Sequence, residues 1–206
     1  MKQTYRRSPL ALTVLALLYE APMHAYRMQQ LIKERGKDEV VNVRQRTSIY
    51  QTIERLERDG LVAVRETLRD EKWPERTVYE LTAEGRRVFP LWLRDMLATP
   101  LAEFPEFPVA IAFLPLLAPD DAQRQLERRA AVLRDEIARL AAQLHDPSHA
   151  LPRLFMLETE YLHATLGTEL EWVRGLIADL RSGALTWSDE WLQQFQQPPA
   201  ANDPPP

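Results

Sequence analysis

The stretch 44–65 constrains this chain more than any other, because it predicts a helix that stops at a glycine and continues directly into a strand. Ser48 is a favourable N-cap, and Gln51 three residues later completes a capping box. Gly60 supplies the left-handed residue that ends a helix, and the strand-forming run 61–64 follows it. Three apolar side chains share one face of this helix: Ile49, Ile53 and Leu56.

The other side of the predicted helix carries groups that suit a DNA groove. Gln51 can form a bidentate contact with an adenine edge. Arg46, Ser48 and Tyr50 suit phosphate oxygens better. We leave Arg55 out of the site, because its acidic neighbours indicate a charge-balanced face in solvent. The residues expected at the groove are Arg46, Thr47, Ser48, Tyr50 and Gln51.

A charged β-hairpin is predicted directly after this helix, in the position of a wing. Its strands are expected over residues 61–67 and 76–81, with 68–75 as the connecting loop. We expect Arg69, Lys72 and Arg76 to contact DNA phosphates. The alternative is a hairpin tip in solvent, which the acidic residues of the same loop favour.

Two helices are predicted before the stretch 44–65 and one after the hairpin. Ser8 caps the first helix, whose apolar run 10–18 is too short to span a bilayer and indicates a core helix. The second covers about 25–34, so the three helices form a helix-turn-helix with one extra helix in front. Thr82 caps the last, which should run to about residue 98 with a kink or restart at Pro90. Its expected inward residues are Val88, Leu91, Trp92 and Met96.

Four short motifs stand in this region: Met23-His-Ala-Tyr26, Thr47-Ser-Ile-Tyr50, Arg55-Leu-Glu-Arg-Asp-Gly-Leu61 and Tyr79-Glu-Leu-Thr-Ala-Glu-Gly-Arg86. In order and spacing, over roughly residues 8–98, they resemble those of PadR-type transcriptional regulators. Ala25 stands where a glycine is usual, and the segment 73–76 replaces a glycine-containing basic wing tip. The resemblance implies repression that a small molecule relieves.

The remainder of the chain predicts a helical dimerisation domain. After residues 1–98, a linker with a short helix covers 99–119, the dimerisation domain 120–196, and a disordered proline-rich tail 197–206. Near-heptad seams favour pairing of two copies, although they could also pack within one chain. One seam contains Leu126, Ala130, Leu133, Ile137, Leu140 and Leu144; the other contains Leu162, Leu166, Leu170, Val173, Ile177 and Leu180.

Charge and composition agree with this division. Residues 1–90 hold 17 basic and 13 acidic side chains, whereas residues 91–206 hold 9 and 17. The basic half therefore suits phosphate, and the acidic half suits solvent or protein. The chain has no cysteine, which excludes disulfides and cysteine-ligated zinc. A cytoplasmic protein is consistent with this.

No motif predicts catalysis or a cofactor. The sequence contains no glycine-rich phosphate loop and no nucleophile elbow. His145 and His149 have a spacing that binds metal on a helix, but Pro147 makes a helix there unfavourable. Six aromatic residues could line an effector pocket between the domains, or form ordinary core: Phe104, Phe107, Phe113, Phe155, Tyr161 and Trp172.

The sequence therefore predicts a mostly α protein with an N-terminal winged helix-turn-helix, a two-stranded wing and a C-terminal long-helix dimerisation domain. The expected function is a homodimeric, sequence-specific repressor on an inverted-repeat operator in double-stranded DNA, released by a small-molecule effector. One alternative is a regulator without a ligand. Another is a helical interaction module whose winged domain binds protein instead of DNA. Salt-dependent binding to a duplex distinguishes the DNA-binding regulator from the interaction module.

Overall fold

The computed structural model describes residues 5–43, 46–70, 73–146 and 151–196 of the chain. The chain divides into two compact units, Met1–Ala102 and Glu103–Pro206. Both are largely helical, and the first also holds a small antiparallel sheet, so the predicted fold class is confirmed.

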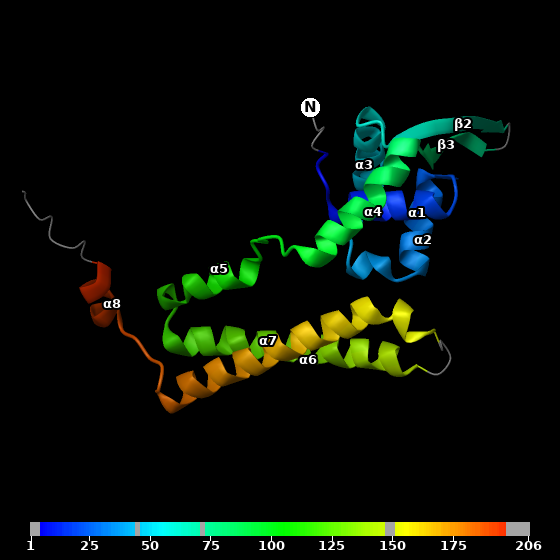
Figure 1. Cartoon of the computed structure of the whole chain (residues 1–206). Helices are drawn as coiled ribbons and strands as arrows, with labels where there is room; N and C mark the ends of the chain where they lie inside the picture. The colour runs from blue at the N-terminus through cyan, green and yellow to red at the C-terminus, as the bar shows by residue number, and fades with distance from the viewer. Residues whose placement is uncertain (1–4, 44–45, 71–72, 147–150, 197–206) are drawn as a thin grey trace, which may run out of the picture. The chain divides into compact units, whose positions relative to one another are not determined.

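The first unit contains a helix-turn-helix followed by a wing (Figure 1). As predicted, Ser8 caps the first helix, its Oγ accepting the Ala11 N–H at 3.2 Å. Thr82 caps the last helix by accepting the Gly85 N–H at 3.0 Å. The elements are α1 (Pro9–Glu20), β1 (Met23–His24), α2 (Ala25–Glu34), the 3-10 helix η1 (Lys37–Glu39), α3 (Arg46–Arg58), β2 (Val62–Asp70), β3 (Trp73–Leu81) and α4 (Ala83–Ala98).

The sheet has three strands in the order β1-β3-β2, whereas the sequence predicted two. β1 pairs antiparallel with β3, with Met23 opposite Tyr79 and His24 opposite Val78. Two residues are too few to show an alternating pattern, so this segment looked like a break between helices. β2 and β3 also continue into the stretch 68–75, predicted as a loop, because the backbone hydrogen bonds of a hairpin do not require apolar side chains.

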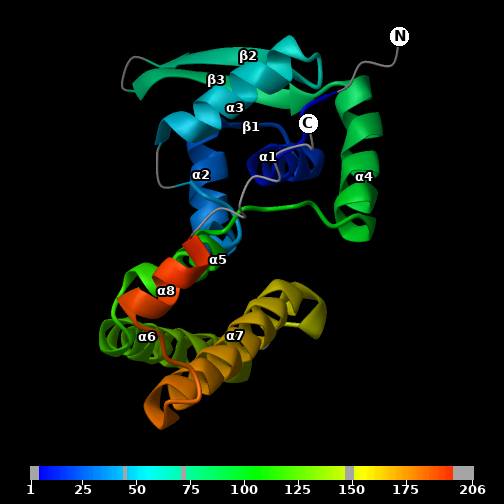
Figure 2. The same cartoon turned by 90° about the vertical axis from the view of Figure 1, so that its left-hand side faces the viewer.

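A hydrophobic core centred on α1 joins the helices of the first unit to its sheet. α1 contacts α3, α4 and β3, while the ends of β2 and β3 extend beyond the helices (Figure 2). Gly60, at a φ of 71°, allows the chain to pass from α3 into β2 as predicted. Fully buried members of the core include Val14, Leu15, Leu18, Met28, Ile32, Ile49, Ile53, Leu56 and Leu61. This core holds α3 by its apolar face.

α4 follows the prediction in its extent and differs from it at one position. Of the kink or restart expected at Pro90, the restart does not occur, since the helix is continuous through this residue. Proline removes one backbone donor, but the burial of Val88 and Trp92 on either side keeps the helix in place. Leu91, predicted to face inward, is 48% exposed. It lies about 100° around the helix from Trp92 and therefore leaves the buried stripe.

The second unit is built on two long helices, α6 (Pro119–His145) and α7 (Leu157–Ser182), which lie side by side (Figure 1). Central residues of both predicted seams face each other in one core: Leu126, Ala130, Leu133, Leu170, Val173 and Ile177. These residues therefore pack against each other within one chain, which was the alternative to pairing of two copies. The shorter segments are α5 (Glu106–Ala112), η2 (Leu114–Leu116), η4 (Arg153–Phe155) and α8 (Asp189–Gln196).

Within the described residues, no helix combines the length and apolar character needed to cross a bilayer. The same residues contain no group of three or more His, Asp or Glu side chains placed to hold a metal ion. His145 Nδ1 lies 2.7 Å from the Ala141 carbonyl oxygen, and His149 falls outside the described residues.

Candidate nucleic-acid interface

The exposed side of α3 is the centre of the candidate interface. Ile49, Ile53 and Leu56 are at most 1% exposed and fix the opposite side of the helix in the core. Tyr50 is 48% exposed, and Gln51 next to it is also exposed. An aromatic hydroxyl and an amide therefore lie together on the accessible side of the helix, as the sequence predicted.

The start of α3 corrects the capping-box prediction. The helix begins at Arg46, so Ser48 lies inside its first turn and is not the N-cap. The Ser48 carbonyl accepts a hydrogen bond from the Thr52 hydroxyl at 2.7 Å. Arg46 and Thr47 occupy the first two helical positions, where the positive end of the helix dipole favours an anion. The side chains of these two residues lie outside the described part of the structure.

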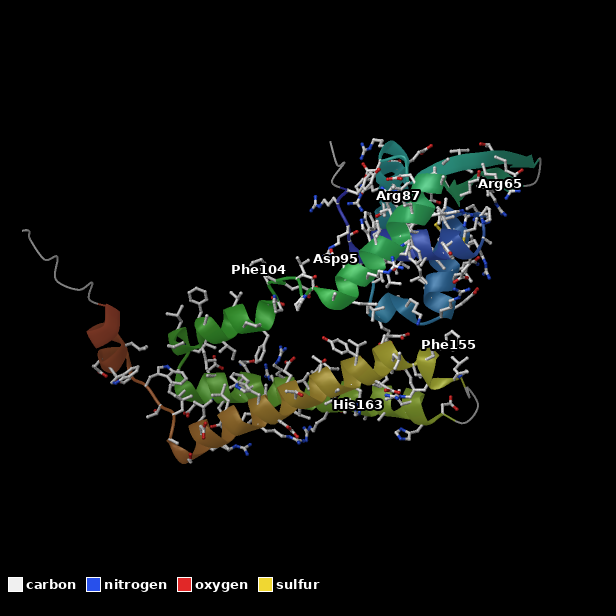
Figure 3. The ribbon with its side chains drawn as sticks, in the orientation of Figure 1. Arg65, Arg87, Asp95, Phe104, Phe155 and His163 are labelled. Carbon is white, nitrogen blue, oxygen red and sulfur yellow. The ribbon has the colours of Figure 1, made fainter. Side chains whose placement is uncertain are left out.

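Three residues of the wing were predicted to contact DNA phosphates, and the structure describes the side chain of one of them. Arg76 is half-buried in β3 opposite Leu68 of β2. The backbone of Arg69 belongs to β2, but its side chain is not among those described, and Lys72 lies outside the described residues. Arg65, which the sequence prediction omitted, is exposed on β2 (Figure 3).

A basic hollow of about 430 Å³ lies at the base of the wing, next to β1. Two arginines, Arg27 and Arg65, line it together with His24 and one carboxylate, Glu66. The His24 Nδ1 accepts the Arg27 N–H at 3.0 Å and so caps α2. Burial lowers the pKa of His24, and the positive charges of Arg76 and Arg27 lower it further. The sequence prediction missed this hollow because it depends on β1, whose two residues show no strand pattern.

Arg55 lies on α3 but does not form the solvated face that its acidic neighbours suggested. Its side chain is half-buried. Nη1 donates to the carbonyl oxygen of Arg6 at 3.1 Å, and Nη2 donates to the Ser8 Oγ at 3.3 Å. Nothing in the local sequence around residue 55 indicates these partners, which lie more than forty residues earlier.

A second candidate site is an apolar groove of about 1060 Å³ within the second unit, between α5, α6 and α7. Phe107 and Trp172 meet there edge to face, with ring centroids 6.0 Å apart. The guanidinium of Arg129 lies 3.6 Å from the centre of the Phe107 ring, and its Nε donates to Glu169 at 2.6 Å. The groove therefore combines an aromatic surface with one arginine–glutamate ion pair.

Only two of the six predicted pocket aromatics line this groove. Phe104 and Tyr161 are 92% and 70% exposed, and Phe155 lies in η4, before the start of α7, and is absent from the lining (Figure 3). Phe113 is likewise exposed and absent from the lining. Sequence spacing could not distinguish these positions, because α5 and α7 are brought together only by tertiary packing.

Comparison with known proteins agrees with this architecture. Residues 14–90 match the model of the transcriptional regulator PadR-like family. No curated protein sequence matches the chain. The match lies inside the region 8–98 in which the four motifs resemble PadR-type regulators, and it confirms that resemblance.

Solved structures of similar fold cover most of the chain. Bacillus subtilis PadR in complex with operator DNA is 17% identical, with a TM-score of 0.65, covering 84% of this chain and 99% of its own. The complex of B. subtilis PadR with p-coumaric acid is 19% identical, with a TM-score of 0.64 and coverages of 84% and 98%. The Streptococcus mutans UA159 protein smu.1604c is 17% identical, with a TM-score of 0.61 and coverages of 84% and 99%. These likenesses establish the fold.

Proposed function

We propose, since residues 14–90 match the model of the PadR-like family of transcriptional regulators, that the protein is a homodimeric repressor that binds an inverted-repeat operator. The observation that carries the proposal is the exposed Tyr50–Gln51 side of α3, held from behind by the core and followed directly by the wing. The family comprises transcriptional regulators and not enzymes.

In this proposal α3 enters the major groove and the wing follows the backbone. Gln51 reads a base edge, since a side-chain amide pairs in a bidentate way with adenine. Tyr50 and Ser48, with Arg46 and Thr47 at the start of the helix, hold phosphates. The wing contacts phosphates through Arg69, Lys72 and Arg76. Arg65, exposed on the same hairpin, adds a fourth basic group.

Dimerisation is proposed for the second unit, through surfaces other than the core between α6 and α7. Large apolar side chains remain exposed on this unit, and contiguous exposed apolar surface is typical of protein interfaces. Two winged units in one dimer can read half-sites about one helical turn, roughly 34 Å, or a multiple of it apart. The exposed apolar residues include Val109, Phe113, Leu116, Tyr161 and Trp172.

Release by a small molecule is proposed at the groove between α5, α6 and α7. Its aromatic lining of Phe107 and Trp172 and its volume suit a small organic ligand. The likeness to B. subtilis PadR, whose structure with p-coumaric acid is known, supports a ligand-responsive regulator. A ligand that prefers one spacing of the two recognition helices would change operator affinity without touching α3. Trp172→Ala should leave the first unit folded yet alter operator affinity or dimer stability.

The proposal is tested by footprinting the protein on the DNA just upstream of its own gene, at several salt concentrations. We expect two protected half-sites and an affinity that falls steeply with salt, because phosphate contacts release counterions. If no duplex is bound in a salt-dependent way, the winged unit binds protein instead, and the interaction-module alternative holds.

A further inference from the structure

The N-terminal arm, defined as residues 5–8, connects α3 with α4. It reaches α3 through the two hydrogen bonds that Arg55 donates to the Arg6 carbonyl and the Ser8 hydroxyl, at 3.1 and 3.3 Å. The Ser8 hydroxyl oxygen also accepts a hydrogen bond from the Ala11 N–H in the first turn of α1. One oxygen atom therefore joins the cap of α1 to the side of α3.

The other end of the arm is fixed to α4. The Tyr5 hydroxyl donates to Glu84 at 3.0 Å, and Tyr5 also packs against the core of the first unit. Glu84 in turn accepts two hydrogen bonds from Arg87, at 2.6 and 2.8 Å. Arg7 forms an ion pair with Asp95 further along the same helix; Arg87 and Asp95 are labelled on α4 in Figure 3.

Arg55 lies on the side of α3 that also carries Gln51, the proposed base-reading residue. It follows Gln51 by four residues, so the two side chains belong to the same stripe of α3, one turn apart. Behind this stripe α3 is held by apolar contacts of Ile49, Ile53 and Leu56. Apolar contacts are non-directional, whereas the hydrogen bonds of a guanidinium fix direction as well as distance.

We infer that Arg55 is a positioning residue, which sets the rotation of the recognition helix α3 through the N-terminal arm and so aims Gln51 at its base. The inference rests on the proposed function of α3. A bidentate base contact requires placement within about 0.5 Å and 10–20°. Loss of the lateral hydrogen bonds therefore reduces discrimination between bases more than it reduces general affinity for DNA.

The test compares binding of the full chain to the footprinted operator and to a scrambled duplex of equal length, over a series of salt concentrations. Arg55→Ala should lower the operator-to-scrambled affinity ratio by about 5–20-fold, a part of the discrimination that one bidentate contact supplies. The salt dependence should keep its slope, because Arg55 neutralises no phosphate. Arg58→Ala is the matched control: it removes an exposed arginine from the same helix, and the ratio should stay the same.

A double-mutant cycle separates positioning from simple support of the fold. If Arg55 acts through Gln51, Arg55→Ala should cause little further loss of base preference once Gln51→Ala is present. Tyr5→Phe loosens the arm at its α4 end without changing any residue of α3, and should lower the ratio by about 2–5-fold. Arg55→Lys keeps the charge but cannot reproduce the two directed bonds. It should give an intermediate loss, even if the alanine variant folds poorly.

Three results would overturn the inference. One is an unchanged ratio with only a lower melting temperature, which would make Arg55 a merely structural residue. Another is an equal loss on both duplexes with a salt slope smaller by about one unit, which would make it a phosphate contact. The third is an unchanged ratio for Tyr5→Phe, which would remove the arm from the argument. If the unaltered protein does not distinguish the two duplexes, the proposed function itself fails.

Discussion

At the scale of single residues, Gln51 offers the most direct test of which face of α3 reads DNA. Gln51→Ala should relax base preference at one operator position and weaken binding there by about 1–3 kcal/mol, because a bidentate amide contact is lost. Selection from operators randomised at each position measures this change. Lys72→Ala should instead weaken binding to all sequences alike and lower the salt slope by about one unit. If Gln51→Ala caused equal losses on specific and random DNA, α3 would present a different face to the groove.

Gly85 is required by close packing. A Cβ at this position would lie 2.0 Å from the Leu61 carbonyl oxygen and 3.0 Å from Leu81 Cδ2. Gly85→Ala should therefore lower the free energy of unfolding by about 1–3 kcal/mol or more, since backbone must move to relieve the overlap. Urea denaturation followed by circular dichroism measures the loss.

Gly175, within α7, provides the matched control for this substitution. A Cβ there would meet nothing within 4 Å. Gly175→Ala should stabilise the protein by about 0.5–1 kcal/mol, because alanine loses less conformational freedom on folding into a helix. Similar destabilisation by both variants would mean that the contact between Gly85 and Leu61 does not decide the outcome.

His24 should make stability depend on pH. Its neutral Nδ1 caps α2, and burial together with Arg76 and Arg27 lowers its pKa from the usual value of 6.5. A lowered folded-state pKa means that the unfolded chain binds the proton more tightly. The contribution of His24 is therefore fully present above about pH 6.5 and is lost as the pH falls towards the folded-state pKa.

His24→Asn isolates this effect, because asparagine can still cap the helix but does not titrate. We expect the free energy of unfolding to fall less steeply for the variant than for the unaltered protein between about pH 7 and pH 5. The pKa values of Glu20 and Glu136 are lowered by the arginines that bond to them, so those carboxylates titrate below their usual 4.5, outside this window. Identical pH dependence in both proteins would refute the role of His24.

At the scale of elements, the pair α6 and α7 depends on a narrow buried seam. Val173 of α7 is 0% exposed, whereas Val132 of α6 is 67% exposed. Val173→Ala should lower the free energy of unfolding by about 1–3 kcal/mol through lost burial and a residual cavity. Val132→Ala should change it by only a few tenths of a kcal/mol, since alanine is the better helix former. An equal loss at both positions would indicate that Val132 is buried against a second chain.

At the scale of the whole molecule, the division of the chain between Ala102 and Glu103 allows us to predict which unit contains the dimer interface. A protein comprising residues 1–102 should sediment as a monomer, while the full chain sediments as a dimer. The physical reason is that the large exposed apolar residues of α5 and α7 are absent from the shorter chain. A stable dimer of residues 1–102 would place the interface in the winged unit instead.

The sequence by itself determined the elements whose signals are local. Ser8 and Thr82 cap helices as predicted, and Gly60 ends α3 with a positive φ. The apolar face of α3 and the central seam residues of α6 and α7 are buried. Each of these features follows from side chains within one or two helical turns of each other, so periodicity and capping preference are sufficient to predict it.

Only the tertiary structure decided the features that depend on distant partners. β1 exists because β3 pairs with it, and the basic hollow beside it follows from that pairing. Arg55 meets the N-terminal arm, and Phe107 meets Trp172, through contacts that no local pattern encodes. Packing also kept α4 continuous through Pro90 and paired the two seams within one chain. Sequence periodicity specifies which face of an element is buried, whereas the partner of that face is chosen by the packing of the complete chain.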